Sequence, residues 1–353
     1  MIVYKTSEQV SKGHPDKMCD QISDAILDAC LRQDETSRVA VETMIKNNTV
    51  VVAGEITSQA TLEIEEIVQT VLQDIGVEEV DKYHVINLLD TQSVDIAKGV
   101  DIGGAGDQGM MYGYATNETK NYMPLAWNLA TRSLVLLQQK NYPLLKPDAK
   151  AQVTVAYENE KPIGIDTFLI STQHIEKATE QQVHEIVTEV MWETAKEFDM
   201  NLDFKRKINP TGRFVIGGSF SDTGLTGRKI IADTYGGEAH HGGGAFSGKD
   251  PTKVDRSGAY MARKIAKDIV KRKMASKCEV GLSYAIGLKE PISVSVDCFH
   301  TNQISLEEII HYIQDNYMLT PEGIIQTLDL RHVNYLDTST YGHFGKEQFS
   351  WEK

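Results

Sequence analysis

Positive charge and glycine are concentrated in one stretch of this sequence. The 353 residues carry a formal net charge of −14, yet 15 Lys and Arg stand against 6 Asp and Glu between Lys205 and Lys273. Eleven of the 27 glycines lie between Gly212 and Gly248. Glycine lets backbone amides approach a ligand closely, and lysine and arginine supply charge that neutralises an anion. We therefore predict that the segment from Lys205 to Arg256 holds the polyphosphate of a nucleotide, with ATP as the first choice.

The segment Gly243–Lys249 matches the GxxxxGK pattern of a phosphate-loop NTPase, but the match stops there. Asp250 occupies the position of the Ser or Thr that binds magnesium in that loop, and no buried strand is predicted before the motif. The pair His240-His241 does not predict zinc, because adjacent histidines do not converge on one ion and no cysteine joins them. No nucleophile with an adjacent base stands out. A substitution at carbon from which triphosphate leaves needs only positive charge and alignment.

The sequence SKGHPDK at residues 11–17 predicts the start of an amphipathic helix. Pro15 suits the first helical position and Asp16 suits the first turn. His14 and Asp16 have two interpretations, which can hold together. They are a helix cap and a partner of the helix dipole, or they bind a phosphate oxygen and the magnesium ion that neutralises it.

Other charged residues also leave two interpretations open. Glu42 and Glu55 interrupt two apolar, β-branched runs, so they either face solvent or project into a site where they hold a cation or an ammonium group. The glycine-rich stretch at residues 92–109 is typical of a mobile loop that closes over substrates. Asp107 lies in this stretch near glycines, and it is either a turn residue or a ligand. The charged turn KPDAK at residues 146–150 is an ordinary surface turn or presents side chains to a site.

Composition excludes several classes of protein. The net charge of −14 argues against nucleic acid or an anionic membrane as the main partner. No apolar run reaches the length of about 18 residues that spans a bilayer, and the first residues do not resemble a signal peptide. The four cysteines lack CxxC spacing and stand in apolar stretches, as reduced thiols do. We predict a cytoplasmic protein that folds without disulfides.

The order helix, β-hairpin, helix occurs three times, and these elements must position the side chains described above. The units cover residues 15–76, 123–198 and 256–316, and in the second unit the strands are predicted at 151–157 and 164–171. Three such units predict an α/β fold of three similar domains in a pseudo-threefold arrangement, each a mixed β-sheet with helices on one face. The alternation of apolar and polar residues leaves the other face to be covered by another sheet or a second subunit.

These motifs closely resemble the S-adenosylmethionine synthase family, also called methionine adenosyltransferases. The family signatures GHPDK, GAGDQG and GGGAFSGKDPTKVDRS stand at residues 13–17, 104–109 and 242–257, in the family's order. NPTGRFVIGG, GLTGRKIIADTYGG and YGHFG are present as well, so the resemblance covers nearly the whole chain. It implies three domains, placed at residues 1–100, 107–214 and 216–353.

The resemblance implies synthesis of S-adenosylmethionine from ATP and L-methionine, by attack of the sulfur on ribose C5′, followed by hydrolysis of the released triphosphate to diphosphate and phosphate. It assigns ATP binding to His14, Asp107, Asp148, Lys150, Arg213, Phe214, Asp222, Arg228, Lys229, Ala245 and Lys249. It assigns methionine binding to Glu55, Gln92, Asp222 and Lys253. The catalytic residues would be His14, Lys150, Arg228, Lys249 and Lys253.

The same resemblance implies two magnesium ions, held by Asp16 and Asp255, and a potassium ion near Glu42. The protein would be a homodimer or homotetramer whose active sites lie between subunits, with Asp107 reaching the site of the partner chain. The segment between Gln92 and Asp107 is about five residues shorter than in familiar bacterial members, which predicts altered loop closure. A magnesium-dependent NTP phosphohydrolase is the runner-up, separated by whether ATP cleavage needs methionine; a non-catalytic nucleotide sensor is a more distant alternative.

Overall fold

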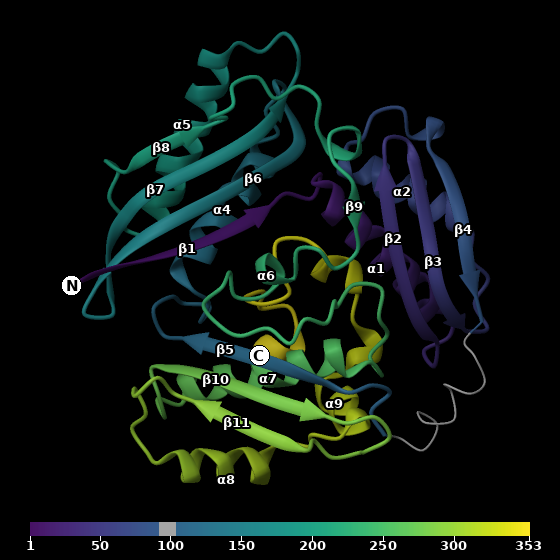
Figure 1. Ribbon diagram of the computed structural model, residues 1–353, viewed down its shortest axis with the longest axis vertical. Coiled ribbons are helices and arrows are strands. Elements are labelled where there is room, and N and C mark those ends of the chain that lie inside the picture. Colours follow the sequence, from purple (N-terminus) through teal and green to yellow (C-terminus); the bar gives the residue numbers. More distant parts are fainter. Residues whose placement is uncertain (92–103) are drawn as a thin grey trace.

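The computed structural model describes residues 1–91 and 104–353 (Figure 1). In these residues three β-sheets each carry helices on one face, and every predicted helix–hairpin–helix unit is present. The predicted α/β fold of three similar units is therefore confirmed. None of the helices in these two ranges combines the length and the apolar character that a bilayer span requires.

The first unit pairs two helices with a four-stranded sheet. The helices are α1 (Pro15–Gln33) and α2 (Ile64–Ile75), and the sheet has the order β4-β3-β2-β9, with β4 at His84–Asp90, β3 at Thr49–Thr57, β2 at Arg38–Lys46 and β9 at Gly224–Leu225. Alternate residues of β2 are buried, as a strand with one face on a helix layer requires. α2 ends at Gly76, where the backbone is left-handed (φ +93°). A short 3₁₀ turn (Val80–Lys82) leads into β4.

The second unit has long strands. Its helices are α4 (Leu125–Lys140) and α5 (Glu180–Glu197), and its sheet has the order β1-β6-β7-β8, with β1 at Ile2–Val10, β6 at Leu145–Glu158, β7 at Lys161–His174 and β8 at Lys205–Ile208. The charged turn 146–150 lies inside β6 and not before it. The register of β6 against β7 shifts between Leu145 and Ala149, and this irregularity accommodates Pro147 within a strand.

The third unit completes the molecule. Its sheet has the order β11-β10-β5, with β11 at Ser293–Asp297, β10 at Lys277–Tyr284 and β5 at Gly109–Thr116. Its helices are α7 (Val254–Lys271), α8 (Leu306–Asn316) and α9 (Pro321–Leu328). Between β9 and α7, the short helix α6 (Ile230–Asp233) and its glycine-rich flanks lie at the centre of the molecule (Figure 1). Short 3₁₀ turns lie at Gly218–Phe220, Leu330–His332, Tyr335–Thr338 and Ser350–Glu352.

Each sheet takes a strand from a distant part of the chain. β1 pairs with β6, β5 pairs with β10, and β9 pairs with β2, all antiparallel. The sequence analysis placed none of these three strands, because local patterning does not show which strands pair across more than 100 residues. The boundaries at 1–100, 107–214 and 216–353 stay a prediction.

Two hydrophobic cores lie beneath the sheets. One is shared by the first and third units, and the other belongs to the second unit. The opposite face of the first sheet is open and apolar: Met44 is 41% exposed, Ile86 46% and Leu88 60%. α1 is buried on nearly all sides because β2, α2, β9 and the 3₁₀ turn at Tyr335–Thr338 surround it. This central helix carries the N-terminal motif.

Candidate active site

His14 caps the N-terminus of α1 and is buried. Its Nδ1 accepts the backbone N–H of Asp16 at 3.2 Å, so the neutral ring carries its proton on Nε2. Burial lowers the pKa of His14 to about 3, assisted by the charges of Lys150 and Lys229. The ring is therefore a neutral donor at physiological pH. The cap interpretation is confirmed, and Nε2 can still donate to a phosphate oxygen.

Asp16 fastens the loop after β9 to the helix. Its Oδ2 accepts from Lys229 Nζ at 2.6 Å, and its Oδ1 accepts the backbone N–H of Leu225 at 3.0 Å. Burial acts to raise the pKa of Asp16, but the hydrogen bonds from Lys229 and Leu225 outweigh it and leave the pKa below its usual value. Asp16 is therefore a carboxylate at neutral pH with an ammonium group beside it. Arg228, next in the chain to Lys229, is exposed.

A second lysine–aspartate pair lies at the N-terminus of α7. Lys249 Nζ is 2.6 Å from Asp255 Oδ2, and both side chains are about one quarter exposed (24% and 26%). Lys253, the N-cap residue of α7, pairs with the buried carboxylate of Asp250. The two carboxylates in the first turns of α1 and α7, Asp16 and Asp255, thus each hold a lysine that a polyphosphate could displace.

Glycines bring the loops of the two pairs into contact. A Cβ added at Gly227, where φ is +78°, would lie 2.4 Å from the Cβ of Ala245. A Cβ added at Gly244 would lie 2.2 Å from Asp255 Oδ1. Only glycine permits both approaches. The Arg228-Lys229 loop and the Lys249 loop are therefore in contact with each other.

Asp148 and Lys150 lie on β6. Asp148 is buried, and its Oδ2 accepts the backbone N–H of Gly218 at 2.8 Å, while its Oδ1 has no partner in the described part of the chain. Burial raises the pKa of Asp148 to about 6. The charges of Lys150 and Asp222 act on both Asp148 and His14, which places all four groups close together. An unpartnered buried carboxylate oxygen suits a ligand hydroxyl or amino group.

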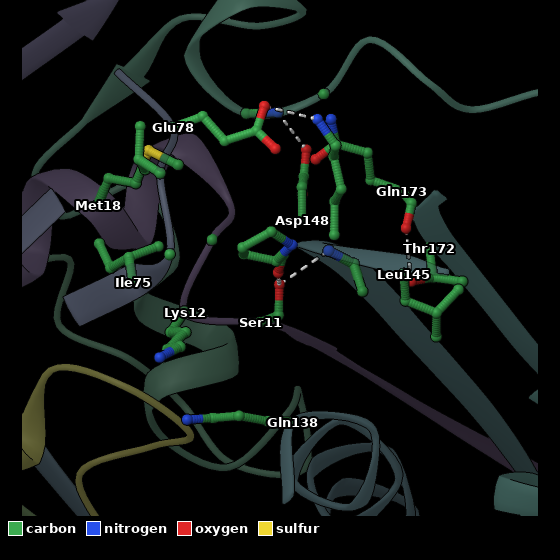
Figure 2. A pocket seen from close by; sticks show the side chains of 18 of the residues that line it. Ser11, Lys12, Met18, Ile75, Glu78, Gln138, Leu145, Asp148, Thr172 and Gln173 are labelled. Atoms are coloured by element: carbon green, nitrogen blue, oxygen red, sulfur yellow. Dashed lines mark hydrogen bonds and ion pairs between the residues drawn. The ribbon is translucent and has the colours of Figure 1, made fainter. Parts of the chain in front are cut away.

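A cavity of about 1060 Å³ lies between residues of the first and second units, and Asp148 is one of the residues that line it (Figure 2). Ser11, Ile75, Gln138 and Gln173 are among its lining residues. Of the expected ATP ligands in the described residues, Asp148 alone lines it. The cavity therefore does not contain the Arg228-Lys229 and Lys249 loops.

Glu42 and Glu55 lie on the open face of the first sheet, and both are exposed. Glu55 stands opposite Ala40, which in turn bridges to Lys249, so this face borders the Lys249 loop. Asp107 is exposed just before β5, and its Oδ1 accepts the backbone N–H of Gln108 at 2.7 Å, as a turn residue does. Gln92 lies outside the described residues.

Arg213 and Phe214 are not joined to the lysine–aspartate pairs by any contact within the described ranges. Arg213 is exposed and pairs with Glu176 at 2.7 Å, and the Phe214 N–H donates to His174 Nε2 at 3.1 Å. The segment continues to Gly218, which Asp148 holds. Their expected place beside ATP stays a prediction.

The carboxylates of Asp16 and Asp255 could hold magnesium only if a bound phosphate supplied further oxygen atoms to the ion. No group of three or more His, Cys, Asp or Glu side chains in residues 1–91 and 104–353 could hold a metal ion by itself. Mg²⁺ typically binds through one or two carboxylates, and phosphate oxygens and water complete its six positions. Asp16 and Asp255, one carboxylate each beside a lysine, match that pattern.

The sequence analysis did not single out Asp20 and Asp24, although both are fully buried beneath the two loops. Asp20 accepts the backbone N–H of Gly227, and Asp24 accepts that of Gly248. A signal was present, because Asp recurs at every fourth position from residue 16 to residue 28 and so lies along one face of a helix. The sequence analysis predicted only that this segment begins an amphipathic helix.

Comparisons with known proteins agree with this geometry. Residues 2–94, 102–214 and 216–353 match the N-terminal, central and C-terminal domains of S-adenosylmethionine synthetase. The chain is also 48% identical to the S-adenosylmethionine synthase of Treponema denticola over 376 aligned positions, which cover all of this chain and 96% of that protein. The similarity thus extends over all three units.

Fold, site and similarity together define a transferase of the methionine adenosyltransferase class, built from three similar α/β units. The chain belongs to the S-adenosylmethionine synthetase family. Its activity is therefore the synthesis of S-adenosylmethionine, with ATP and methionine as the substrates that the family implies.

Proposed function

We propose that this enzyme joins methionine to adenosine by attack of the methionine sulfur on ribose C5′ of ATP, and that the same site then hydrolyses the released triphosphate to diphosphate and phosphate. The sulfur lone pair forms the S–C5′ bond, the C5′–O bond breaks, and its electrons leave with the triphosphate. The observation that carries this proposal is the pair of lysine–aspartate contacts, Lys229 with Asp16 and Lys249 with Asp255. When the two ammonium groups turn from these carboxylates to the polyphosphate, they supply positive charge where the leaving group would accumulate negative charge.

His14 donates from Nε2 to a phosphate oxygen, since its low pKa keeps it neutral and its Nδ1 is occupied by the cap. Lys150, Arg228, Lys249 and Lys253 neutralise the triphosphate. Asp148 accepts from the nucleoside through its unpartnered Oδ1. No covalent intermediate on cysteine is proposed, because all four cysteines, Cys19, Cys30, Cys278 and Cys298, are buried.

Two magnesium ions, held by Asp16 and Asp255, would lower the charge of the polyphosphate when bound. Lys229 and Lys249 would then turn from these carboxylates to phosphate oxygens. A potassium ion would bind near Glu42. Methionine would be held by Glu55, Gln92, Asp222 and Lys253. Glu42 and Glu55 are exposed on a sheet face that borders the Lys249 loop, which supports this arrangement.

We further propose a homodimer, or a tetramer built from two such dimers, with each active site shared between two subunits. The apolar residues Met44, Ile86 and Leu88 on the open face of the first sheet support it, because such a face is ordinarily covered. The exposed position of Arg213, whose guanidinium pairs with Glu176, leaves it available to a second subunit and supports the proposal as well. Asp107 would reach the site of the other subunit. Such a protein would work in the cytoplasm.

Isotope labelling tests the bond that breaks. ATP carrying ¹⁸O in the C5′–O–P bridge is incubated with methionine, magnesium and potassium, and the products are analysed by mass spectrometry. Attack at C5′ places the label in the inorganic products and none in S-adenosylmethionine. Label retained on a nucleoside product, or ATP cleavage that proceeds equally without methionine, would establish phosphoryl transfer instead.

Replacement of Asp16 tests the metal. Asp16→Asn keeps the hydrogen bond to Leu225 but removes the charge, so the magnesium concentration for half-maximal activity is expected to rise about 10-fold or more and kcat to fall. Titration of magnesium at saturating ATP measures both. Asp28→Asn on the same helix is the control, since Asp28 contacts Tyr335 and Leu336 and no expected phosphate ligand. An unchanged magnesium requirement in Asp16→Asn would exclude Asp16 as a ligand.

A further inference from the structure

α1 carries an aspartate at every fourth position, namely Asp16, Asp20, Asp24 and Asp28, and all four are at most 3% exposed. Residues four apart on a helix share a face, so these carboxylates are neighbours of like charge. Burying a carboxylate is costly unless it is hydrogen-bonded and paired. Each of them must therefore have partners from outside the helix.

Those partners are backbone N–H groups from more than 200 residues away in the sequence. Leu225 donates to Asp16 at 3.0 Å, Gly227 to Asp20 at 2.8 Å and Gly248 to Asp24 at 2.8 Å; Tyr335 and Leu336 donate to Asp28 at 2.8 and 2.9 Å. One face of one helix thus holds three separate downstream segments.

Asp20 holds the loop that carries Arg228 and Lys229. Gly227, which donates to it, immediately precedes these two residues and has a left-handed backbone (φ +78°). The other oxygen of Asp20 accepts from Lys17 at 2.9 Å, and Lys17 also pairs with Asp233 at 2.6 Å. The ammonium group of Lys17 is thus shared by two buried carboxylates, Asp20 and Asp233.

Asp24 holds Lys249 from both sides. It accepts from the backbone N–H of Gly248, the residue before Lys249. Both of its oxygens also accept from Nη2 of Arg256, each at 2.9 Å. Arg256 in turn donates to the carbonyl oxygen of Lys249 at 2.8 Å. Asp24 and Arg256 are fully buried, and their contacts are with each other and with the backbone of the Lys249 loop. Both act on the position of the Lys249 backbone.

We propose that Asp20 and Asp24 are positioning residues for the reaction: their carboxylates fix the two glycine loops so that Arg228, Lys229 and Lys249 converge on the departing triphosphate. Alignment is worth much in such a reaction, since a displacement of about 1 Å costs about 100-fold in rate. This inference rests on the proposed function. Asp28 is built alike but holds a segment with no expected phosphate ligand, so it provides a matched control.

The test compares Asp20→Ala and Asp20→Asn with Asp28→Ala and Asp28→Asn. Asp20→Ala removes the acceptor for Gly227, and kcat for S-adenosylmethionine is expected to fall about 100-fold while the KM for methionine changes less than about threefold. Asp20→Asn keeps a carbonyl oxygen for Gly227, so most of kcat should return. Asp28→Ala should lower the melting temperature as much as Asp20→Ala does, yet leave kcat of the folded protein within about threefold.

A binding measurement separates this inference from the proposed reaction. The affinity of each folded variant for inorganic triphosphate with magnesium is measured by calorimetry, and we expect about 10-fold weaker binding for Asp20→Ala alone. If wild type made no S-adenosylmethionine, the proposed function would fail while this comparison still stood. Equal losses of kcat and affinity in Asp20→Ala and Asp28→Ala, or no recovery in Asp20→Asn, would overturn the positioning role.

A double variant tests the role of Asp24 and Arg256. It also keeps the inference testable if the single variants do not fold. Asp24→Asn with Arg256→Met removes both buried charges together, so neither is left unpaired. The amide oxygen still accepts from Gly248, but the hydrogen bond to the Lys249 carbonyl is lost. Folded protein with kcat lowered about 10-fold or more is expected; folded protein with wild-type kcat would exclude Asp24 and Arg256 from the role.

Discussion

Charged side chains in this protein are used in pairs, and burial decides what each pair does. The lysines Lys229 and Lys249 are 18% and 24% exposed, so they can exchange their carboxylate partners, Asp16 and Asp255, for phosphate. Lys17 with Asp20 and Arg256 with Asp24 are fully buried, and they can only hold the backbone in place. The sequence shows the same residue types in both groups. The two groups differ in the exposure of the positively charged side chain.

Lys249→Met is expected to lower kcat about 100- to 1000-fold, because it removes a positive charge at the position of the leaving triphosphate. The KM for methionine should change much less. Steady-state kinetics with each substrate varied in turn measures both. Lys205→Met is the control: it belongs to the same basic stretch of sequence but pairs with Asp166 on the surface, and should keep wild-type kcat. Equal losses in the two variants would contradict the assignment.

His343 predicts a pH dependence of stability. It is fully buried, its Nδ1 is 2.8 Å from Tyr260 Oη, and burial lowers its pKa far below the value of about 6.5 of a free imidazole. The unfolded chain therefore binds a proton below about pH 6.5 that the folded chain does not, so the free energy of unfolding falls as pH falls through this range.

His343→Asn removes the titrating group and keeps a polar atom near Tyr260. We expect a less stable protein whose unfolding midpoint in urea falls less between pH 7 and pH 5 than that of wild type. His311→Asn, at an exposed position of α8, is the control. A slope as steep in His343→Asn as in wild type would show that other groups cause the dependence.

At the scale of elements, close approach of backbones positions the site. α7, whose first turn carries Asp255, packs on β5 at Gly113, where an added Cβ would lie 1.9 Å from the backbone carbon of Ala262. α1 is held by strands and turns on every side. The two helices that begin at the site are therefore fixed by contacts that leave no room for a methyl group.

Gly113→Ala should destabilise the protein by about 3 kcal/mol or more, since either α7 or β5 must move. Activity of the remaining folded protein should fall as well, because Asp255 moves with α7. Differential scanning calorimetry and kinetics measure these effects. Gly237→Ala is the control: an added Cβ meets nothing within 4 Å there, so only the positive φ of +96° is strained, at about 1 kcal/mol. A Gly113→Ala protein as stable as that control would refute the close packing.

At the scale of the whole molecule, three units surround the central glycine-rich segment between β9 and α7 (Figure 1). The first and third units share a core, and the second has its own. The open sheet face with Met44, Ile86 and Leu88 is the surface on which a second copy is proposed to lie. A shared site can be tested by mixing inactive subunits.

Asp107→Ala and Lys249→Met each inactivate the enzyme if both residues serve the reaction. When the two variants are unfolded, mixed equally and refolded, half of the dimers contain one subunit of each kind. If Asp107 serves the site of the other subunit, one site in each such dimer is intact, so about one quarter of wild-type activity returns. No return of activity would place both residues in one subunit's site. Leu88→Asp should prevent dimerisation, as measured by analytical ultracentrifugation.

The sequence by itself determined the helices, the hairpins and their threefold repetition, because these depend on periodicity and on local turn chemistry. It also located the glycine-rich basic region and the helix cap at His14. It did not place β1, β5 or β9 in their sheets, and it did not give Asp20 and Asp24 a role. Those outcomes depend on contacts between residues more than 100 positions apart, which local patterning does not show: Asp16, Asp20 and Asp24 are all buried on one helix, yet each accepts from a different downstream residue.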